Sequence, residues 1–269
     1  MKILSGKVAV VTGAGSGIGR ALAQQLARGG ARLALSDVNT ASLAEPLSLL
    51  PPGCEVRTYV LDVSVRAAVF EHAQAVQRDF GSAHYVFNNA GVTLGGSIEH
   101  SSIEEIEWLL GINLWGVIYG TKAFLPMLLA QGEGHIINIS SVFGMISFPY
   151  QGAYNVSKFG VRGLTECLWQ ELEGSGVDVT LVHPGGVKTA IGTTARMAAL
   201  AGEHEREVMG KSVKALLTPP EKMAAAILRG VLKRRKRIIY GEGSRMLVGL
   251  GRWLPESYGK VVRFLIRHI

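Results

Sequence analysis

Cysteine and charge are both scarce in this sequence. The 269 residues include two cysteines, Cys54 and Cys167, which excludes a disulfide scaffold and fits a reducing compartment. Only 18% of the residues are charged, which excludes a disordered chain. No window of about 18 residues lacks charged or helix-breaking residues, and residues 1–7 lack the apolar stretch of a signal peptide. We therefore expect a cytoplasmic protein without a transmembrane helix.

Hydrophobic residues are plentiful, and their spacing predicts the fold class. They make up 48% of the chain, enough for the core of a single domain over residues 1–269. Short β-branched runs alternate with longer segments of helical period, which is typical of βαβ units. We expect strands at Val8–Val11, Arg32–Ser36, Glu55–Val60, His84–Phe87, His135–Ile139, Val177–Val182 and Ile238–Tyr240, and helices at Ile18–Arg28, Val65–Phe80, Ile103–Leu129, Ala153–Glu173 and Glu221–Val231. The pattern predicts an α/β protein with a doubly wound parallel sheet (Rossmann fold) of about seven strands, with helices on both faces.

Glycine is the most over-represented residue, and several glycines form one motif. The chain has 34 glycines, and the run Thr12-Gly13-Ala14-Gly15-Ser16-Gly17-Ile18-Gly19 joins the first expected strand to the first expected helix. Phosphate groups bind to backbone amides at a helix N-terminus, and a Cβ at the turn would block their approach. Because the glycines stand between a strand and a helix, the motif predicts a dinucleotide phosphate site rather than only a tight turn.

Asp37 ends the second expected strand, 18 residues after Gly19. A carboxylate at this place accepts hydrogen bonds from the ribose diol of NAD and repels the 2′-phosphate of NADP. The next residues, Val38 and Asn39, offer no cation for a phosphate. The sequence therefore favours NAD, with NADP as the alternative. A purely structural role for Asp37, at a turn or a helix N-cap, stays open.

Six short motifs follow one another along the chain. In order, they are the TGxxxGxG loop of residues 12–19, Asn88-Asn89-Ala90-Gly91, Asn113, Ser140-Ser141, Tyr154-x-x-x-Lys158 and Pro184-Gly185. In these motifs the sequence resembles the short-chain dehydrogenase/reductase family, over about residues 5–190 and less specifically in the seventh strand. The resemblance implies an NAD(P)-dependent oxidoreductase that transfers a hydride between a secondary alcohol or ketone and a nicotinamide cofactor.

The resemblance implies four catalytic residues, Asn113, Ser141, Tyr154 and Lys158. Tyr154 and Lys158 are four residues apart on an expected helix and so share a face. A phenol ionises at about pH 10, so Tyr154 needs the Lys158 ammonium and the oxidised nicotinamide to lower its pKa before it can act as general acid/base. Ser141 would hold the substrate oxygen, and Asn113 would hold a water that relays protons to Lys158. Side-chain chemistry does not separate Ser141 from Ser140, but the family spacing selects Ser141.

Further cofactor contacts follow from the same resemblance. Asp62 and Val63 would flank the adenine, and the PGxVxT pattern that begins at Pro184 would border the nicotinamide. For Asn88 and Asn89, a structural role between neighbouring strands is an equally good interpretation. The expected cofactor-binding residues are Gly13, Ser16, Gly17, Ile18, Gly19, Asp37, Asp62, Val63, Asn89, Ala90, Gly91, Tyr154, Lys158, Pro184, Gly185, Val187 and Thr189. No cluster has the spacing of metal ligands, so no metal site is expected.

A long irregular stretch, residues 189–220, is expected to form a substrate lid over the nicotinamide. The lid and the segment after the serines are rich in apolar residues: Ile191, Met197, Leu200, Met209, Val213, Leu216, Leu217, Phe143, Met145, Phe148 and Tyr150. This lining predicts an apolar or bulky alcohol or ketone, because no cluster of cations awaits an acidic group. Packing of the lid onto the core would explain the same residues. His183, directly before the PGxVxT pattern, is interpreted as a structural residue.

The net charge of +7 comes from the C-terminal part of the chain. Residues 1–220 hold 16 basic and 18 acidic side chains, whereas residues 221–269 hold 12 basic and 3 acidic ones. Basic residues alternate with apolar ones such as Trp253 over 241–269, which predicts a basic amphipathic tail. A solvated face, a peripheral membrane contact and packing on another subunit are its open interpretations. The family resemblance implies a homodimer or homotetramer. No nucleic-acid partner is expected, because one would leave the six motifs unexplained.

Two other functions use the same motifs. An epimerase or dehydratase would carry out different hydride-based chemistry in the same fold, and a dinucleotide sensor would bind the cofactor without catalysis. The sensor is disfavoured because the chain keeps all four expected catalytic residues, whereas a sensor would need only the glycine loop. The sequence does not identify the substrate, its stereochemistry or the working direction.

Overall fold

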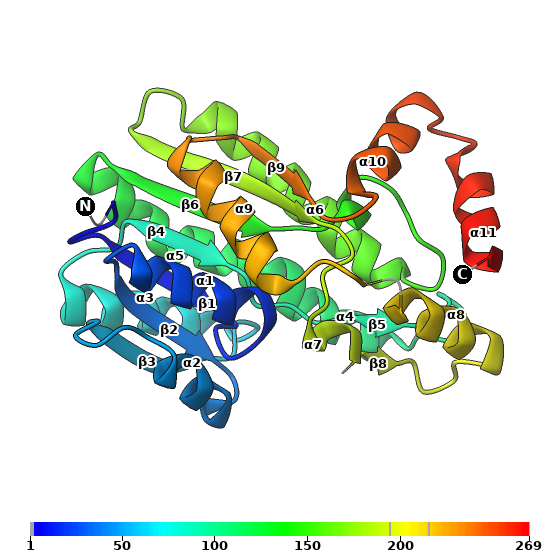
Figure 1. Cartoon of the computed structure of the whole chain (residues 1–269), viewed down its shortest axis with the longest axis horizontal. Helices are drawn as coiled ribbons and strands as arrows, with labels where there is room; N and C mark the ends of the chain where they lie inside the picture. The colour runs from blue at the N-terminus through cyan, green and yellow to red at the C-terminus, as the bar shows by residue number, and fades with distance from the viewer. Residues whose placement is uncertain (1–2, 194, 215, 269) are drawn as a thin grey trace.

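Seven parallel strands form the centre of the protein (Figure 1). The computed structural model describes residues 3–193, 195–214 and 216–268. The strands are β1 (Val8–Thr12), β2 (Arg32–Asp37), β3 (Val56–Val60), β4 (Tyr85–Asn88), β6 (Gly134–Ile139), β7 (Val177–Pro184) and β9 (Arg237–Tyr240). Their order is β3-β2-β1-β4-β6-β7-β9, with every neighbouring pair parallel. The predicted doubly wound α/β fold is confirmed.

Helices cover both faces of this sheet (Figure 1). One face carries α1 (Gly17–Arg28) and α9 (Pro220–Leu232), and the other carries α3 (Arg66–Phe80), α5 (Gly116–Gln131) and α6 (Gly152–Glu171). In β1, Ala9 and Val11 pack in the hydrophobic core on the first face, whereas Val8 and Val10 pack in the core on the second. Burial on both faces explains why the strands read as continuous apolar runs in the sequence.

The helix expected over Ile103–Leu129 contains a change of pitch. It begins as α4 (Ile103–Leu110), where Ser102 and Glu105 form a capping box, passes through the π-helical turn η2 (Gly111–Trp115), and continues as α5. By length and composition, the 29 residues from Ile103 to Gln131 could cross a membrane, which the sequence analysis did not anticipate. Phe124 and Leu128 are buried against the sheet, so in this structure α5 is a core helix.

Further short elements and helices were not among the strands and helices expected from the sequence. They are η1 (Thr40–Leu43), α2 (Ala44–Ser48), β5 (Leu94–Gly95), η3 (Val142–Gly144), α7 (Ala190–Thr193), β8 (Arg196–Met197), α8 (Glu203–Lys214), α10 (Ser244–Trp253) and α11 (Tyr258–His268). Of these, α10 and α11 fall in the predicted amphipathic tail. The irregular loop expected over residues 189–220 therefore contains α7, β8 and α8. Strand β8 pairs in parallel with β5, which joins this segment to the chain that follows β4.

Candidate active site

Most of the predicted site residues line one cavity at the carboxyl ends of the strands, where ligands of open α/β sheets bind. Its volume is about 530 Å³. The predicted residues on its wall are Gly13, Ser16, Gly17, Ile18, Asp37, Asp62, Val63, Asn89, Ala90, Gly91, Ser141, Tyr154, Lys158, Pro184, Val187 and Thr189. Gly19, Asn113 and Gly185 lie behind this wall. A Cβ on Gly19 would lie 2.1 Å from the Gly13 carbonyl oxygen, so Gly19 serves close packing.

The glycine loop leaves one end of the cavity open to a phosphate group. Gly13 and Gly17 have positive φ angles of 64° and 51°, and a Cβ on Gly13 would lie 2.8 Å from the Cα of Ala90. Ser16 is the N-cap of α1, but its side chain makes no capping hydrogen bond. Because Ser16 and the first residues of α1 line the cavity, the first amides of this helix are placed to bind a phosphate. These residues fit a dinucleotide cofactor.

Asp37 holds the glycine loop in place. Its Oδ2 accepts a hydrogen bond from the Gly15 amide at 2.9 Å, and its Oδ1 accepts one from the Asn39 amide at 3.1 Å. The structural role that the sequence left open is therefore present. It does not exclude a ribose contact, because each carboxylate oxygen can accept more than one hydrogen bond and Asp37 lines the cavity.

Asn89 also has a structural role. Its Nδ2 donates to the carbonyl oxygen of Thr12 at 2.9 Å, while the Thr12 hydroxyl accepts the amides of Asn89 and Ala90, each at 3.0 Å. The neighbouring Asn88 donates to the Asn138 side chain at 2.8 Å inside the sheet. Both asparagines therefore fasten neighbouring strands together, as the structural interpretation proposed, and Asn89 still lines the cavity.

The π-helical turn places Asn113 behind the catalytic cavity. Asn113 is fully buried, its Oδ1 accepts the Val92 amide at 2.8 Å, and its Nδ2 donates to the Val92 carbonyl at 2.9 Å. A Cβ on Gly91 would lie 3.2 Å from Asn113 Oδ1 and 3.6 Å from Lys158 Nζ. Asn113 thus fixes the backbone beside Lys158. A π-helical turn within an α-helix is often found at a functional site.

The two adjacent serines have different surroundings. Both are buried and line the cavity, but the Ser140 hydroxyl donates to the backbone carbonyl of Lys158 at 2.8 Å. The Ser141 hydroxyl accepts the Phe143 amide at 3.1 Å and bonds to the Tyr154 hydroxyl, which opposes the rise in the pKa of Tyr154. Geometry therefore favours Ser141 as the serine that acts with Tyr154, which side-chain chemistry alone did not decide.

Tyr154 and Lys158 lie together on α6, and burial disfavours the charged form of each. Lys158 Nζ is 5.6 Å from the centroid of the Tyr154 ring and donates to the Ile139 carbonyl at 3.1 Å. Burial lowers the pKa of Lys158 to about 8. Burial also raises the pKa of Tyr154, whereas the sequence analysis expected Lys158 to lower it. The difference arises because the phenolate would lose its water in this cavity.

The other end of the cavity is apolar. Its walls include Val92, Trp108, Phe143, Ile191, Met209, Val213 and Leu216. The charged residues on the whole cavity wall are Asp37, Asp62 and Lys158, all among the predicted cofactor contacts. Of the other apolar residues named from the sequence, Leu200 and Leu217 are exposed, and Met145, Phe148 and Tyr150 do not line the cavity.

Gln151 and Trp108 are among the residues on this wall that sequence reasoning missed. Gln151 is the N-cap of α6, three residues before Tyr154, and its amide donates to the Met209 sulfur at 3.4 Å. Trp108 lies in the last turn of α4. The spacing to Tyr154 would have been a usable signal for Gln151, because residues three apart share a helix face. Nothing in the sequence marked Trp108.

A parallel sheet with a glycine loop and a Ser-Tyr-Lys set on one cavity wall defines a class of protein, the dinucleotide-binding oxidoreductases. The model of the family described as short chain dehydrogenase matches residues 7–199, and the chain belongs to this family. SadH of Mycobacterium tuberculosis, named as an oxidoreductase, is 45% identical over 97% of this chain and 96% of its own.

Solved structures of the same family share the fold. A short chain dehydrogenase/reductase from Burkholderia phymatum, in complex with NAD, has a TM-score of 0.85 and 36% identity, and the match covers 94% of this chain and 95% of that one. A metagenomic short-chain oxidoreductase, in complex with NADP, has a TM-score of 0.70 and 31% identity over 85% and 91% of the two chains. Relatives thus bind either nicotinamide cofactor.

Proposed function

We propose that this protein transfers a hydride between NAD and the carbinol carbon of an apolar or bulky secondary alcohol, or in reverse to the ketone. One observation carries the proposal. Ser141, Tyr154 and Lys158 line the same cavity as the glycine loop, between its phosphate-binding end and its apolar end. A substrate carbon held there would lie beside the nicotinamide ring of a cofactor whose phosphates bind at the N-terminus of α1.

The chain's own residues would handle the proton of this reaction. When bound, the nicotinamide supplies the hydride acceptor or donor. In the oxidation direction, Tyr154 as phenolate takes the proton of the substrate hydroxyl, and in reduction it returns that proton to the carbonyl oxygen. The Lys158 ammonium stabilises the phenolate through its charge. Because the Ser141 oxygen already accepts the Phe143 amide, its own hydrogen is directed to Tyr154 or the substrate oxygen.

The experiment that tests this proposal compares Tyr154→Phe with Tyr59→Phe. Tyr59 bonds to Asp79 at 2.6 Å and does not line the cavity, so it is a matched control. With an alcohol selected from a panel ordered by size and polarity, Tyr154→Phe should lose about 100-fold or more in the rate of NADH formation. Near wild-type turnover by Tyr154→Phe would remove this assignment.

The same assay separates the alternative functions. Steady accumulation of NADH with a secondary alcohol is expected of a dehydrogenase. An epimerase or dehydratase would convert substrate without net NADH, and a sensor would bind cofactor without converting any member of the panel. The presence of the Ser-Tyr-Lys set favours an enzyme over a sensor, since a sensor has no use for a general acid/base.

The preference for NAD rests on Asp37. The described residues that line the adenosine end of the cavity include Asp37, Val38 and Asp62, and no Lys or Arg, so a 2′-phosphate would meet negative charge. Titration with both cofactors should show tighter binding of NAD. Asp37→Asn should shift the ratio toward NADP by about tenfold. Wild-type protein that prefers NADP by tenfold would overturn the preference.

We also propose that residues 189–220 act as the substrate lid and that the basic tail makes a peripheral membrane contact. On α10, Arg245 and Arg252 are seven residues apart and so share a stripe, and Met246 and Trp253 share the adjacent stripe. Met246 and Trp253 are 58% and 79% exposed. A stripe of cations beside exposed apolar side chains suits an anionic lipid surface.

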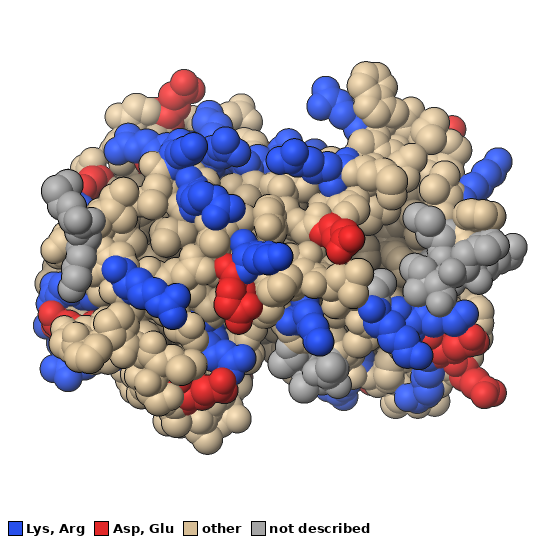
Figure 2. All heavy atoms as spheres, in the orientation of Figure 1, with Lys and Arg blue, Asp and Glu red and all other residues tan. Residues whose placement is uncertain are grey.

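A second basic run precedes the tail. Lys233–Lys236 stands at the start of β9, and Figure 2 shows basic side chains gathered over this end of α9 and β9, whereas α10 follows the other end of β9. Sedimentation with phosphatidylserine vesicles at low and high salt tests the contact. Arg245→Ala with Arg252→Ala should lose binding that Lys233→Ala with Lys236→Ala keeps. No binding of wild-type protein at low salt would exclude it. Cytoplasmic location and assembly as a homodimer or homotetramer stay predictions.

A further inference from the structure

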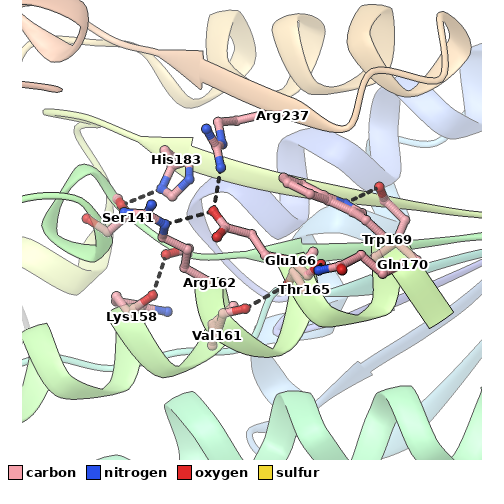
Figure 3. A network of polar contacts seen from close by, with 12 residues as sticks. Ser141, Lys158, Val161, Arg162, Thr165, Glu166, Trp169, Gln170, His183 and Arg237 are labelled. Carbon is pink, nitrogen blue, oxygen red and sulfur yellow. Dashed lines mark hydrogen bonds and ion pairs between the residues drawn. The ribbon is translucent and has the colours of Figure 1, made fainter. Parts of the chain in front are cut away.

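His183 lies directly behind the Ser141 peptide. It is fully buried near the end of β7, and its Nδ1 is 2.7 Å from the Ser141 carbonyl oxygen (Figure 3). A carbonyl oxygen only accepts hydrogen bonds, so Nδ1 carries the proton and donates it. Among the described residues, Nε2 has no hydrogen-bond partner. The imidazole therefore has one directed contact, and that contact is with the backbone of a predicted catalytic residue.

The surroundings of His183 keep its ring neutral. Burial lowers the pKa of His183 to about 4; the contact with the Ser141 carbonyl opposes this shift. Arg162 and Arg237 lower the pKa further and Glu166 raises it, and Glu166 itself is paired with both guanidinium groups (Figure 3). Across the pH range in which a dehydrogenase would be assayed, His183 keeps the same tautomer and does not exchange protons.

Ser141 is held by three hydrogen bonds, one of them from the Gly144 backbone amide to its carbonyl oxygen at 2.9 Å. Its carbonyl oxygen accepts from His183, and its hydroxyl oxygen accepts from the Phe143 amide at 3.1 Å. The residue has an extended backbone, with φ −161° and ψ 165°, at the junction between β6 and η3. Without the histidine, the Ser141 carbonyl would keep only the backbone hydrogen bond from Gly144 and would lose its one side-chain contact. The rotation of the peptide would then be less restrained, and the direction of the hydroxyl depends on that rotation.

We propose that His183 is a positioning residue, whose Nδ1–H group fixes the Ser141 peptide and thereby aims the Ser141 hydroxyl at Tyr154 and the substrate oxygen. The inference rests on the proposed function, because it assigns His183 a role in the same reaction. It differs from the structural interpretation of the sequence, which gave the histidine no link to catalysis. A donor at the position of Nδ1 is what the role requires, and neither the ring nor a charge is needed.

Two substitutions separate this role from simple packing. His183→Asn keeps an N–H donor near the position of Nδ1, and His183→Leu keeps the apolar bulk without a donor. His135 provides the control, since it is also buried in the sheet and its Nε2 contacts the Thr180 hydroxyl at 2.7 Å, away from the cavity. The variants are compared as full-length protein with saturating NAD and the best alcohol of the panel.

His183→Leu should lower kcat by about tenfold or more, because a small displacement of a catalytic group is costly, while the Kd for NADH changes by less than about twofold. His183→Asn should keep kcat within about threefold of wild type with a superimposable pH profile, and His135→Leu should keep kcat while losing thermal stability. Wild-type kcat in His183→Leu, or an equal loss in His183→Asn, would overturn the inference. Should His183→Leu not fold, the kcat and pH profile of His183→Asn decide.

Ser141→Ala distinguishes this inference from the proposed function. If Ser141→Ala turns over substrate like wild type, the proposed function is wrong in the role that it gives Ser141. If Ser141→Ala is inactive while His183→Leu is fully active, the proposed function stands and only the role of His183 fails. The two outcomes use the same assay and the same substrate.

Discussion

At the scale of single residues, the adjacent serines provide the sharpest test of the site. Ser141→Ala should lower kcat by about 100-fold, because it removes the group that contacts Tyr154 and would hold the substrate oxygen. Ser140→Ala removes a hydrogen bond to the Lys158 carbonyl, which should cost about 1 kcal/mol of unfolding free energy and leave kcat within about threefold. Steady-state kinetics and urea unfolding of both variants provide the comparison. A larger loss of kcat in Ser140→Ala would reverse the assignment.

Lys158 should destabilise the protein that it activates. Its pKa is about 8 in the fold against an ordinary value of 10.5, so between these values the unfolded chain binds more protons than the folded one. In the cofactor-free protein, this group makes stability rise with pH from about 8 to 10.5, and its full cost is present below pH 8.

Lys158→Met should therefore increase the free energy of unfolding at pH 7 by about 1–3 kcal/mol and abolish turnover. The increase should shrink as pH approaches 10, because wild-type Lys158 is then neutral in the fold. Urea unfolding at pH 7, 9 and 10, without cofactor, measures both effects. A Lys158→Met protein less stable than wild type at pH 7 would show that the ammonium has partners that offset its burial.

At the scale of elements, sequence patterns predicted what depends on burial and failed where single contacts decide. The central strands were found because their residues are apolar on both faces, whereas β3 at the edge of the sheet is largely exposed. The π-helical turn was missed because one extra residue scarcely disturbs a helical period, although Asn113 stood out as a poor helix former. Elements α7 and β8 are short, and α8, although it has 12 residues, was expected to be part of an irregular loop.

The lid segment is held by two buried carboxylates from different elements. Glu105 on α4 accepts the Ala199 amide at 3.1 Å. Glu205 on α8 accepts the amides of Ser97 at 2.7 Å and Gly202 at 2.6 Å, and it contacts His100 at 2.8 Å. Hydrogen bonds from Ser97 and His100 lower the pKa of Glu205 to about 2, so it stays ionised at ordinary pH. These long-range contacts order a segment that looks irregular in sequence.

Glu205→Gln should loosen this lid. An amide has one acceptor oxygen where the carboxylate has two, so at least one of the backbone amides would lose its partner. Hydrogen exchange of residues 199–214 should become faster, and KM for the alcohol should rise by about threefold to tenfold. Glu203→Gln, in the first turn of α8 and exposed, is the control. Unchanged hydrogen exchange in Glu205→Gln would show that the pairing of β5 with β8 and the Glu105 contact hold the lid without Glu205.

At the scale of the whole molecule, the sheet brings together residues that are far apart in sequence. The order of motifs and the rule that carboxyl ends of parallel strands share one edge were sufficient to predict which segments meet. Side-chain direction was not predictable from the same information. Ser140 and Ser141 are chemically the same and differ in the direction of their side chains. The hydrogen bond from His183 to Ser141 joins two residues that are 42 positions apart in the chain.

Three buried neutral histidines make the stability of the molecule depend on acid. His72, His135 and His183 each have a pKa lowered by burial to about 4, against 6.5 when exposed. Between pH 6.5 and 4 the unfolded chain therefore binds more protons than the folded protein. These groups make stability fall as pH decreases through this window and have no effect above it.

The free energy of unfolding should decrease between pH 6.5 and 5 with a slope of up to about three protons from these groups. His72→Leu should remove about one proton from that slope without changing kcat. Neither ring nitrogen of His72 has a hydrogen-bond partner among the described residues, and the ring makes edge-to-face contacts with Tyr59 and Phe124, away from the cavity. Urea unfolding at half-unit pH steps measures both slopes. Equal slopes in wild type and His72→Leu would mean that His72 takes up its proton in the folded protein, through local opening at the edge of α3.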